Sequence, residues 1–173
     1  MVFADVDGDG RDELIANAAY CPVPGVFIYQ PGEDVTAPWR KHAVITGLFS
    51  EGIAAADLDG DGRLEIAAGP YWLAPPAAGP FSGPWKRRVY APSFREMCRV
   101  ATVDITGNGR ADLVITDSEY LDGRLSWFEN CLVEDPTHPW VEHVLEETPV
   151  IYSHSLAAWQ EDGATRVFLA EMA

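Results

Sequence analysis

The chain is poor in basic residues and in cysteine, and it contains no long hydrophobic run. Its 173 residues carry 12 Lys and Arg against 27 Asp and Glu, which gives a formal net charge of −15. Nucleic acid is therefore disfavoured as a partner, because phosphate binding needs clustered basic side chains. No signal peptide and no apolar run of about 18 residues is visible, so no membrane span is predicted within the chain.

The three cysteines, Cys21, Cys98 and Cys131, lie far apart and form no C-x-x-C pair. An odd number gives no complete disulfide framework, although one bridge plus a free thiol remains an alternative. The cysteines therefore do not settle the compartment. Zinc-ligand spacings, nucleophile elbows and phosphate-binding loops are also missing, so no standard catalytic motif is available.

The chain instead contains three copies of an acidic loop, at residues 5–13, 57–65 and 104–112. Oxygen side chains stand at loop positions 1, 3 and 5, a backbone carbonyl follows at position 7, and an acid stands at position 9. Such groups converge when the chain coils, and Ca²⁺ takes roughly six to eight oxygen ligands. The predicted ligands are Asp5, Asp7, Asp9, Arg11 and Glu13; Asp57, Asp59, Asp61, Arg63 and Glu65; and Asp104, Thr106, Asn108, Arg110 and Asp112, each arginine through its carbonyl.

The loops do not follow the helical calcium motifs. An EF-hand loop needs an acid at position 12, and the chain has Ala16, Ala68 and Ile115 there. A glycine at position 6 supplies the sharp turn, because only glycine enters φ > 0 cheaply. Solvated Asp-Gly hairpin turns are the alternative for one isolated copy, but three copies in register favour a cation. The third loop, with neutral oxygens at Thr106 and Asn108, should bind more weakly.

The repeat extends beyond the loops. Asp5 and Asp57 are 52 residues apart, Asp57 and Asp104 are 47 apart, and a Pro-Trp pair recurs at 38–39, 84–85 and 139–140. A period near fifty residues that carries several short strands is typical of a propeller blade. At the fourth expected position, 159–166, the sequence keeps the phase but lacks the metal ligands, which predicts a degenerate loop.

Each period contains four predicted strands. In the second copy the first strand covers residues 52–56 and the second strand covers 64–69. The short aromatic third strand is clearest at 25–29 and 123–128. The fourth strand follows the Pro-Trp pair, as at 39–45 and 140–145. The fold class is therefore all-β, with propeller blades of four antiparallel strands over residues 1–173. About three and a half blades are present, with little room for a strand before Asp5. Since a ring needs roughly four to eight blades, the rest should come from further chain or, less favoured, from self-association.

The loops, above all residues 56–66 and their two counterparts, resemble the FG-GAP/VCBS-type calcium-binding β-propeller repeats of integrin α-subunit heads and many secreted bacterial proteins. This resemblance implies Ca²⁺ as the cofactor. Weak calcium sites fill only where calcium is abundant, so an extracellular or periplasmic location is expected. A narrower resemblance links the Trp-x-x-His strand and residues 126–130 to the propeller of aldos-2-ulose dehydratase-like proteins, sugar lyases that join such a propeller to cupin domains. No cupin is present here.

Propeller geometry places the calcium loops on one face and predicts a ligand face opposite, built from loops on a rigid scaffold. The candidates for the ligand face are Tyr20, Glu51, Tyr71, Trp72 and Arg95, and the candidates for catalysis are His154, Tyr120 and Glu119. Aromatic residues beside carboxylates suit sugars, but Trp and Tyr equally pack between blades. His42 and His143 recur at matching positions of the fourth strand, which indicates a structural role.

Two functions remain open at this level. The first is a calcium-stabilised binding or scaffold module that recognises a carbohydrate or a protein. The second is the propeller part of a carbohydrate lyase or dehydratase, in which His154 and a nearby acid or tyrosine act as base and acid. The sequence does not choose between them; a cupin encoded further along the same reading frame would favour the enzyme.

Overall fold

A computed structural model describes residues 1–172, and over these residues the chain is all-β, with fourteen strands in four antiparallel sheets. The first blade contains β1 (Val2–Ala4), β2 (Glu13–Ala18), β3 (Gly25–Gln30) and β4 (Arg40–Thr46). The second blade contains β5 (Ile53–Ala56), β6 (Glu65–Ala68), β7 (Tyr71–Ala74) and β8 (Lys86–Val89). The third blade contains β9 (Cys98–Val103), β10 (Asp112–Asp117), β11 (Gly123–Asn130) and β12 (Trp140–Val150). A half-blade contains β13 (Ser153–Glu161) and β14 (Ala164–Glu171).

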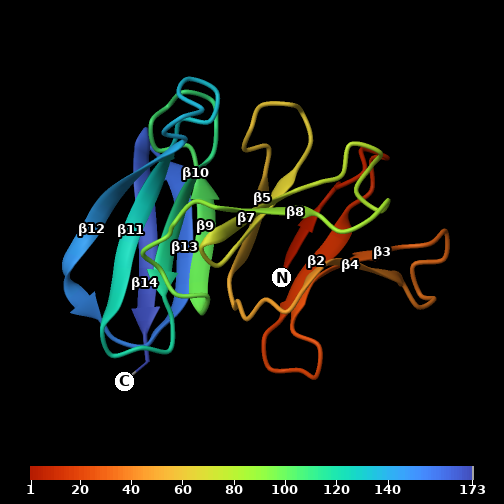
Figure 1. Cartoon of the computed structure of the whole chain (residues 1–173), viewed down its shortest axis with the longest axis horizontal. Coiled ribbons are helices and arrows are strands. Elements are labelled where there is room, and N and C mark those ends of the chain that lie inside the picture. Colours follow the sequence, from red (N-terminus) through yellow and green to blue (C-terminus); the bar gives the residue numbers. More distant parts are fainter. Residues whose placement is uncertain (173) are drawn as a thin grey trace.

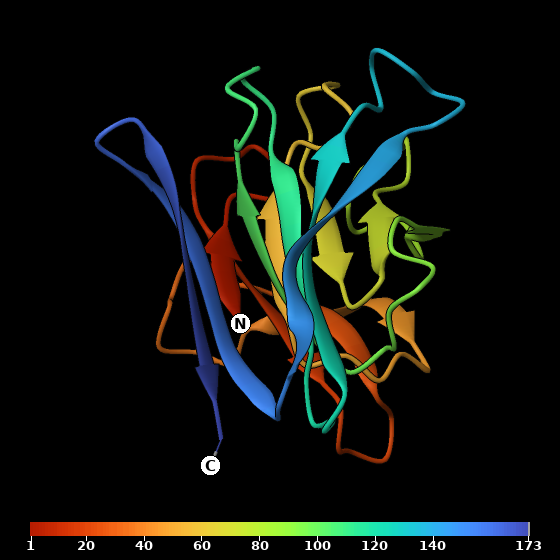
Figure 2. The same ribbon diagram turned by 90° about the vertical axis from the view of Figure 1, so that its left-hand side faces the viewer.

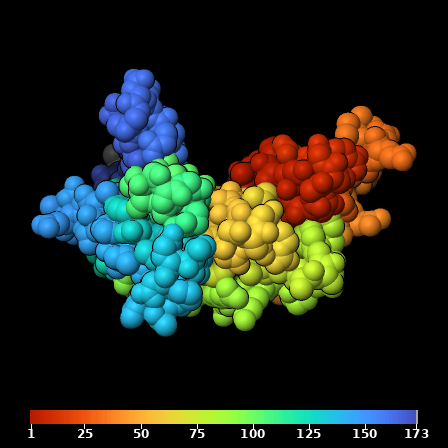
Figure 3. Space-filling view, turned by 90° about the horizontal axis from the view of Figure 1, so that it is seen from above, coloured from red at the N-terminus to blue at the C-terminus, as the bar shows by residue number. Residues whose placement is uncertain are grey.

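Each sheet is a meander in which sequence neighbours pair, as in a propeller blade. The sheets stand side by side, and their first strands contact one another in series: β1 with β5, β5 with β9, and β9 with β13 (Figure 1). Figure 2 shows the half-blade flanking the third blade. Seen from above, the molecule is an open arc with the half-blade at one end and the first blade at the other (Figure 3). The predicted all-β partial propeller of about three and a half blades is confirmed.

The hydrophobic core lies between the blades rather than inside any one of them. One cluster joins the first and second blades through Ile15 and Ile66, and another joins the second and third through Trp72 and Leu113. A smaller cluster around Val114 packs the third blade against the half-blade. Because each fully buried aliphatic side chain contributes about 1.5–3 kcal/mol, the blades stabilise one another.

Small residues let the first strands approach closely. Gly52, just before β5, donates its N–H to the carbonyl of Cys98 at 2.7 Å. A Cβ at Gly52 would lie 2.5 Å from the Cα of Arg99 and 2.4 Å from the backbone nitrogen of Val100. The second and third blades therefore meet at a distance that only glycine permits at this position.

The segment before the first acidic loop differs from the sequence-based expectation. The sequence left little room for a strand before Asp5, yet residues 2–4 form the short strand β1. Three residues are enough, because they pair in register with Ile15, Leu14 and Glu13 of β2. The first blade therefore has all four of its strands.

The loop expected to be degenerate at 159–166 is shorter than predicted. Strand β13 continues through Glu161 and β14 begins at Ala164, so the two strands are paired across most of this span. Only Asp162 and Gly163 turn, with φ of 51° and 76°, as in a two-residue Asp-Gly hairpin. The half-blade has a tight hairpin where the three full blades have an acidic loop.

The histidines that recur in the fourth strands both stack on aromatic rings. His42 in β4 lies 4.3 Å from Phe81, and His143 in β12 lies 4.1 Å from Trp127, measured between ring centroids. All three cysteines are free thiols, with Cys21 exposed and Cys98 buried, so the alternative of one disulfide bridge is not realised. Within the described residues, no helix is long and apolar enough to cross a membrane.

Candidate functional site

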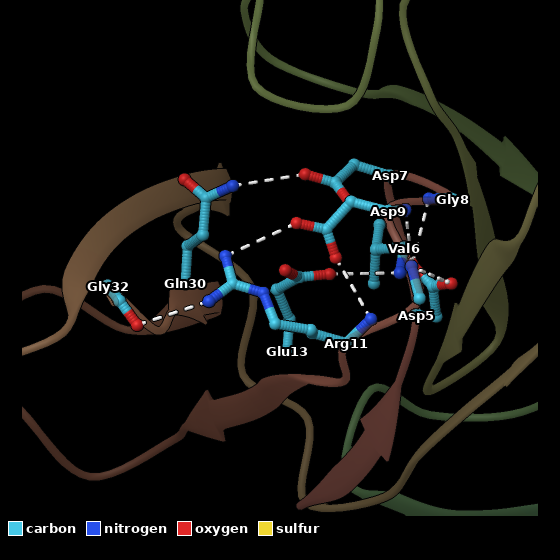
Figure 4. Close-up of polar contacts among 10 residues, drawn as sticks. Asp5, Val6, Asp7, Gly8, Asp9, Arg11, Glu13, Gln30 and Gly32 are labelled. Atoms are coloured by element: carbon cyan, nitrogen blue, oxygen red, sulfur yellow. Dashed lines mark hydrogen bonds and ion pairs between the residues drawn. The ribbon is translucent and has the colours of Figure 1, made fainter. Parts of the chain in front are cut away.

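The three acidic loops connect the first and second strands of the three blades and lie at the same end of the blades. In Figure 3 they form neighbouring red, yellow and green areas along the arc. The carboxylate at position 1 accepts hydrogen bonds from backbone N–H groups of its own loop. Asp5 Oδ1 accepts from Gly8 (2.8 Å) and Asp9 (3.1 Å) (Figure 4), and Asp5 Oδ2 accepts from Gly10 (2.9 Å). Asp57 and Asp104 make the same contacts with the glycines of their own loops.

The acid at position 9 closes each loop from below. Glu13, Glu65 and Asp112 are 0–1% exposed, although each is the first residue of a second strand. Each accepts a hydrogen bond from the backbone N–H of loop position 2, at 2.8–2.9 Å. The position-9 acid is therefore fixed by both the strand and the loop, with its carboxylate directed into the loop.

The second loop fits a cation best. Its three aspartates, Asp57, Asp59 and Asp61, bring one ligand oxygen each within 4.8 Å of one another. Asp59 Oδ1 and Glu65 Oε1 are buried and have no hydrogen-bond partner. A buried acceptor without a partner is costly, and a bound cation would satisfy both oxygens. Burial, together with the charges of Asp59 and Asp61, raises the pKa of Glu65 to about 7.

The first loop is partly arranged for a cation. Asp5, Asp7 and Glu13 bring ligand oxygens within 4.8 Å of one another. Asp9 instead pairs with the side chain of Arg11 at 3.3 Å (Figure 4). Burial also raises the pKa of Glu13, against the effect of the hydrogen bond from the backbone of Val6. Asp9 would have to leave Arg11 to become a ligand, as Asp61 of the second loop would have to leave Arg63.

The third loop fits a cation least well. Both carboxylate oxygens of Asp112 already accept backbone hydrogen bonds, Oδ2 from Ile105 and Thr106 and Oδ1 from Asn130. The side-chain oxygen of Asn108 accepts one from the N–H of Arg110 at 2.9 Å, a contact that the other two loops share. With fewer charges and fewer free oxygens, this loop holds its shape through hydrogen bonds. The carbonyl ligands predicted at Arg11, Arg63 and Arg110 stay predictions.

A buried asparagine that the sequence analysis did not select joins two of the loops. Asn130, at the end of β11, is 1% exposed, and its side-chain amide donates to the carbonyls of Leu58 (2.8 Å) and Ala111 (3.0 Å). Leu58 belongs to the second loop and Ala111 to the third. The contact crosses two blades and has no local sequence signal, so sequence patterns could not have found it.

At the opposite end of the blades, three side chains from three sheets converge. Glu51 precedes β5, Glu119 follows β10 and His154 lies in β13, and each offers a ligand atom within 4.8 Å of the others. His154 Nε2 lies 3.3 Å from Glu119 Oε1. Glu51 pairs with Arg99 at 3.0 Å, a residue that the sequence analysis did not name. We call Glu51, Glu119 and His154 the channel-mouth cluster.

Two further predicted residues are Tyr20 and Tyr120, and Tyr120 follows Glu119 directly in the chain. Tyr20 is 78% exposed, and its pKa is raised by partial desolvation and by the charges of Glu51 and Glu119. The guanidinium of Arg95 lies 4.0 Å from the ring centroid of Tyr120. Arg95 also forms a forked pair with Asp122, at 2.8 and 2.9 Å.

The other two aromatic candidates lie in β7. Tyr71 is partly buried, and its hydroxyl group donates a hydrogen bond to Glu96 at 3.1 Å. Trp72 is 2% exposed and belongs to the core between the second and third blades. Its assignment to the ligand face does not agree with this burial. An aromatic residue in a short strand gives the same pattern whether it faces a ligand or a neighbouring blade, so the sequence could not separate the two.

Comparison with known proteins agrees with the loop geometry. Residues 5–68 match the family model of the FG-GAP-like repeat, a span that runs from the first acidic loop through the second strand of the second blade. The fold and the loops therefore define a protein of propeller blades, of which residues 5–68 are similar to an FG-GAP-like repeat. No curated protein matches the chain. Nothing in these comparisons supports the narrower resemblance to aldos-2-ulose dehydratase-like proteins.

Proposed function

We propose that this chain is a calcium-stabilised β-propeller module that serves binding or scaffolding. The observation that carries the proposal is the pair of buried, unpartnered oxygens in the second loop, Asp59 Oδ1 and Glu65 Oε1. Three acids with ligand atoms within 4.8 Å of one another repel without a cation. Ca²⁺ matches an all-oxygen ligand set of this kind. An extracellular or periplasmic location, where calcium is abundant, agrees with this proposal.

The ligand in this proposal is a carbohydrate or a protein bound at the channel-mouth cluster. Tyr20 exposes an aromatic face, and the channel-mouth cluster supplies two carboxylates as hydrogen-bond acceptors, groups that suit sugar rings. The remaining blades of the propeller come from further chain or from self-association. Exposed apolar side chains on the half-blade, such as Phe168 (52%) and Trp159 (44%), support an additional covering partner.

Calcium binding is tested by calorimetric titration and by thermal melting with calcium and with chelator. We expect saturating calcium to raise the melting midpoint, since a ligand at about 100 times its Kd stabilises by about 2.7 kcal/mol. An unchanged midpoint would contradict the proposal. Ligand binding is tested separately on a glycan array: His154→Ala and Tyr120→Ala should abolish it and leave calcium-dependent melting intact.

A carbohydrate lyase or dehydratase is the second candidate. The observation that favours it is the contact between His154 Nε2 and Glu119 Oε1 at 3.3 Å, an arrangement in which a carboxylate orients a histidine for proton transfer. Elimination from a panel of sugars, followed by the absorbance of the unsaturated product, tests this candidate. Turnover that survives in His154→Ala would remove it.

A further inference from the structure

The channel-mouth cluster combines two carboxylates with an imidazole: Glu51 lies just before β5, Glu119 just after β10, and His154 within β13. We propose that Glu51, Glu119 and His154 bind a divalent transition-metal ion of the Zn²⁺ class, at a site separate from the calcium loops. Their ligand atoms lie within 4.8 Å of one another, so small side-chain movements would bring all three to an ion. The cluster differs from an acidic surface patch because the imidazole supplies a nitrogen ligand.

Backbone contacts within and between the blades fix the positions from which the three side chains extend. The N–H of Gly52, which follows Glu51, donates a hydrogen bond to the carbonyl of Cys98. The N–H of Ser118, which precedes Glu119, donates one to the carbonyl of Met97 at 2.8 Å. Ser118 also forms a parallel bridge with Ser153, which precedes His154. The cluster is therefore built on the junction of the second blade, the third blade and the half-blade, and a metal ion would join all three.

The polar contacts of Glu51 with Arg99 and Ser118 use only one of its two carboxylate oxygens. Within residues 1–172, Arg99 and Ser118 both contact Oε2 of Glu51, at 3.0 and 3.1 Å, so Oε1 is left for a metal. The Arg99 charge offsets one of the two carboxylates. Metal ligation by an imidazole requires the neutral form of the ring. With His154 neutral, a divalent ion would face a net charge of about −1 from Glu51, Glu119 and Arg99 together.

The donor set selects the class of ion. Carboxylates alone suit Ca²⁺ and Mg²⁺, whereas imidazole suits Zn²⁺, Fe²⁺, Ni²⁺ and Cu²⁺. Three protein ligands leave at least one coordination position open, as in catalytic zinc sites. The side chains of Glu119 and His154 are 32% and 44% exposed, so that open position is accessible to a ligand with hydroxyl or carboxylate groups.

Cobalt and zinc titrations of the intact chain, with calcium present in saturating amounts, test the site. We expect one Co²⁺ per chain with the visible absorption of nitrogen and oxygen ligation, displaced by Zn²⁺. His154→Ala and Glu119→Gln should each weaken Co²⁺ binding at least tenfold while the calcium-dependent melting midpoint stays within a few degrees of wild type. Glu119→Gln keeps the test valid if His154→Ala does not fold.

His143→Ala is the matched control. His143 forms a similar pair with Glu129 at 3.1 Å and is 40% exposed, but no third ligand joins it in the described part of the chain. We expect this variant to bind Co²⁺ as wild type does. Three results would overturn the proposal: no Co²⁺ bound in the presence of calcium, equal binding by His154→Ala and wild type, or a thiolate charge-transfer band that assigns the ion to exposed Cys21.

Discussion

Replacing Asp59 with asparagine should stabilise the calcium-free protein while reducing the stabilisation that calcium provides. The change keeps the side-chain shape and removes one negative charge from the second loop, where Asp57, Asp59 and Asp61 bring ligand atoms within 4.8 Å. At 4.8 Å two unit charges repel by about 0.9 kcal/mol in bulk water and by about 3.5 kcal/mol at an effective dielectric constant of about 20. Arg63 pairs with Asp61 and offsets part of its charge, so only a fraction of the larger figure is left as repulsion. Relief of about 1 kcal/mol is expected in chelator.

With calcium present, the same variant lacks a charged ligand. We expect its Kd for calcium to rise at least tenfold, so the stabilisation that calcium provides should fall by about 1.4 kcal/mol or more. Each kcal/mol corresponds to about 2–4 °C in the melting midpoint of a chain of this size. The midpoint should therefore rise slightly in chelator, and the increase caused by calcium should shrink.

Differential scanning fluorimetry and calorimetric titration of the two states measure both effects. Thr106→Val in the third loop is the matched control, since it removes a neutral oxygen and no charge. We expect Thr106→Val to change the calcium-induced increase less than Asp59→Asn does. A lower midpoint of Asp59→Asn in chelator, or an unchanged response to calcium, would refute the assignment of Asp59 as a charged calcium ligand.

Three further predictions concern the scaffold. Gly52→Ala should lower the free energy of unfolding by about 1–3 kcal/mol in urea titrations, because its Cβ would overlap the backbone of Arg99; wild-type stability would contradict the close approach. Burial lowers the pKa of His42. The contribution of the neutral ring to the free energy of unfolding is therefore present above about pH 6.5 and is lost as the pH falls through the lowered pKa. His42→Phe should therefore lose less stability than wild type between about pH 7 and pH 5. An equal loss in the two proteins would show that other groups cause the pH dependence. Asn130→Ala should destabilise by about 1–3 kcal/mol through unpaired buried carbonyls; a change below about 0.5 kcal/mol would contradict that role.

The blade architecture could be predicted because its signals are local and repeated. An Asp-Gly loop fixes where a first strand ends and a second begins, and the Pro-Trp pair marks the start of the fourth strand. The predicted second strand at 64–69 corresponds to Glu65–Ala68, and the predicted fourth strand at 140–145 begins at Trp140. Trp72 was misplaced because facing direction depends on the neighbouring blade, and Asn130 was missed because its partners lie in another loop.

The repeat phase also accounts for one member of the channel-mouth cluster, His154, and for Arg99, which pairs with Glu51. Counting five residues back from the loop starts at Asp57 and Asp104, and from position 159, gives Gly52, Arg99 and His154. These are equivalent positions near the starts of β5, β9 and β13, whose series of contacts forms the inner line of the arc. Gly52 has no side chain, so Arg99 can approach the second blade and pair with Glu51. A position that repeats in the chain therefore varies in chemistry from blade to blade, and this variation gives one end of the propeller its polar side chains.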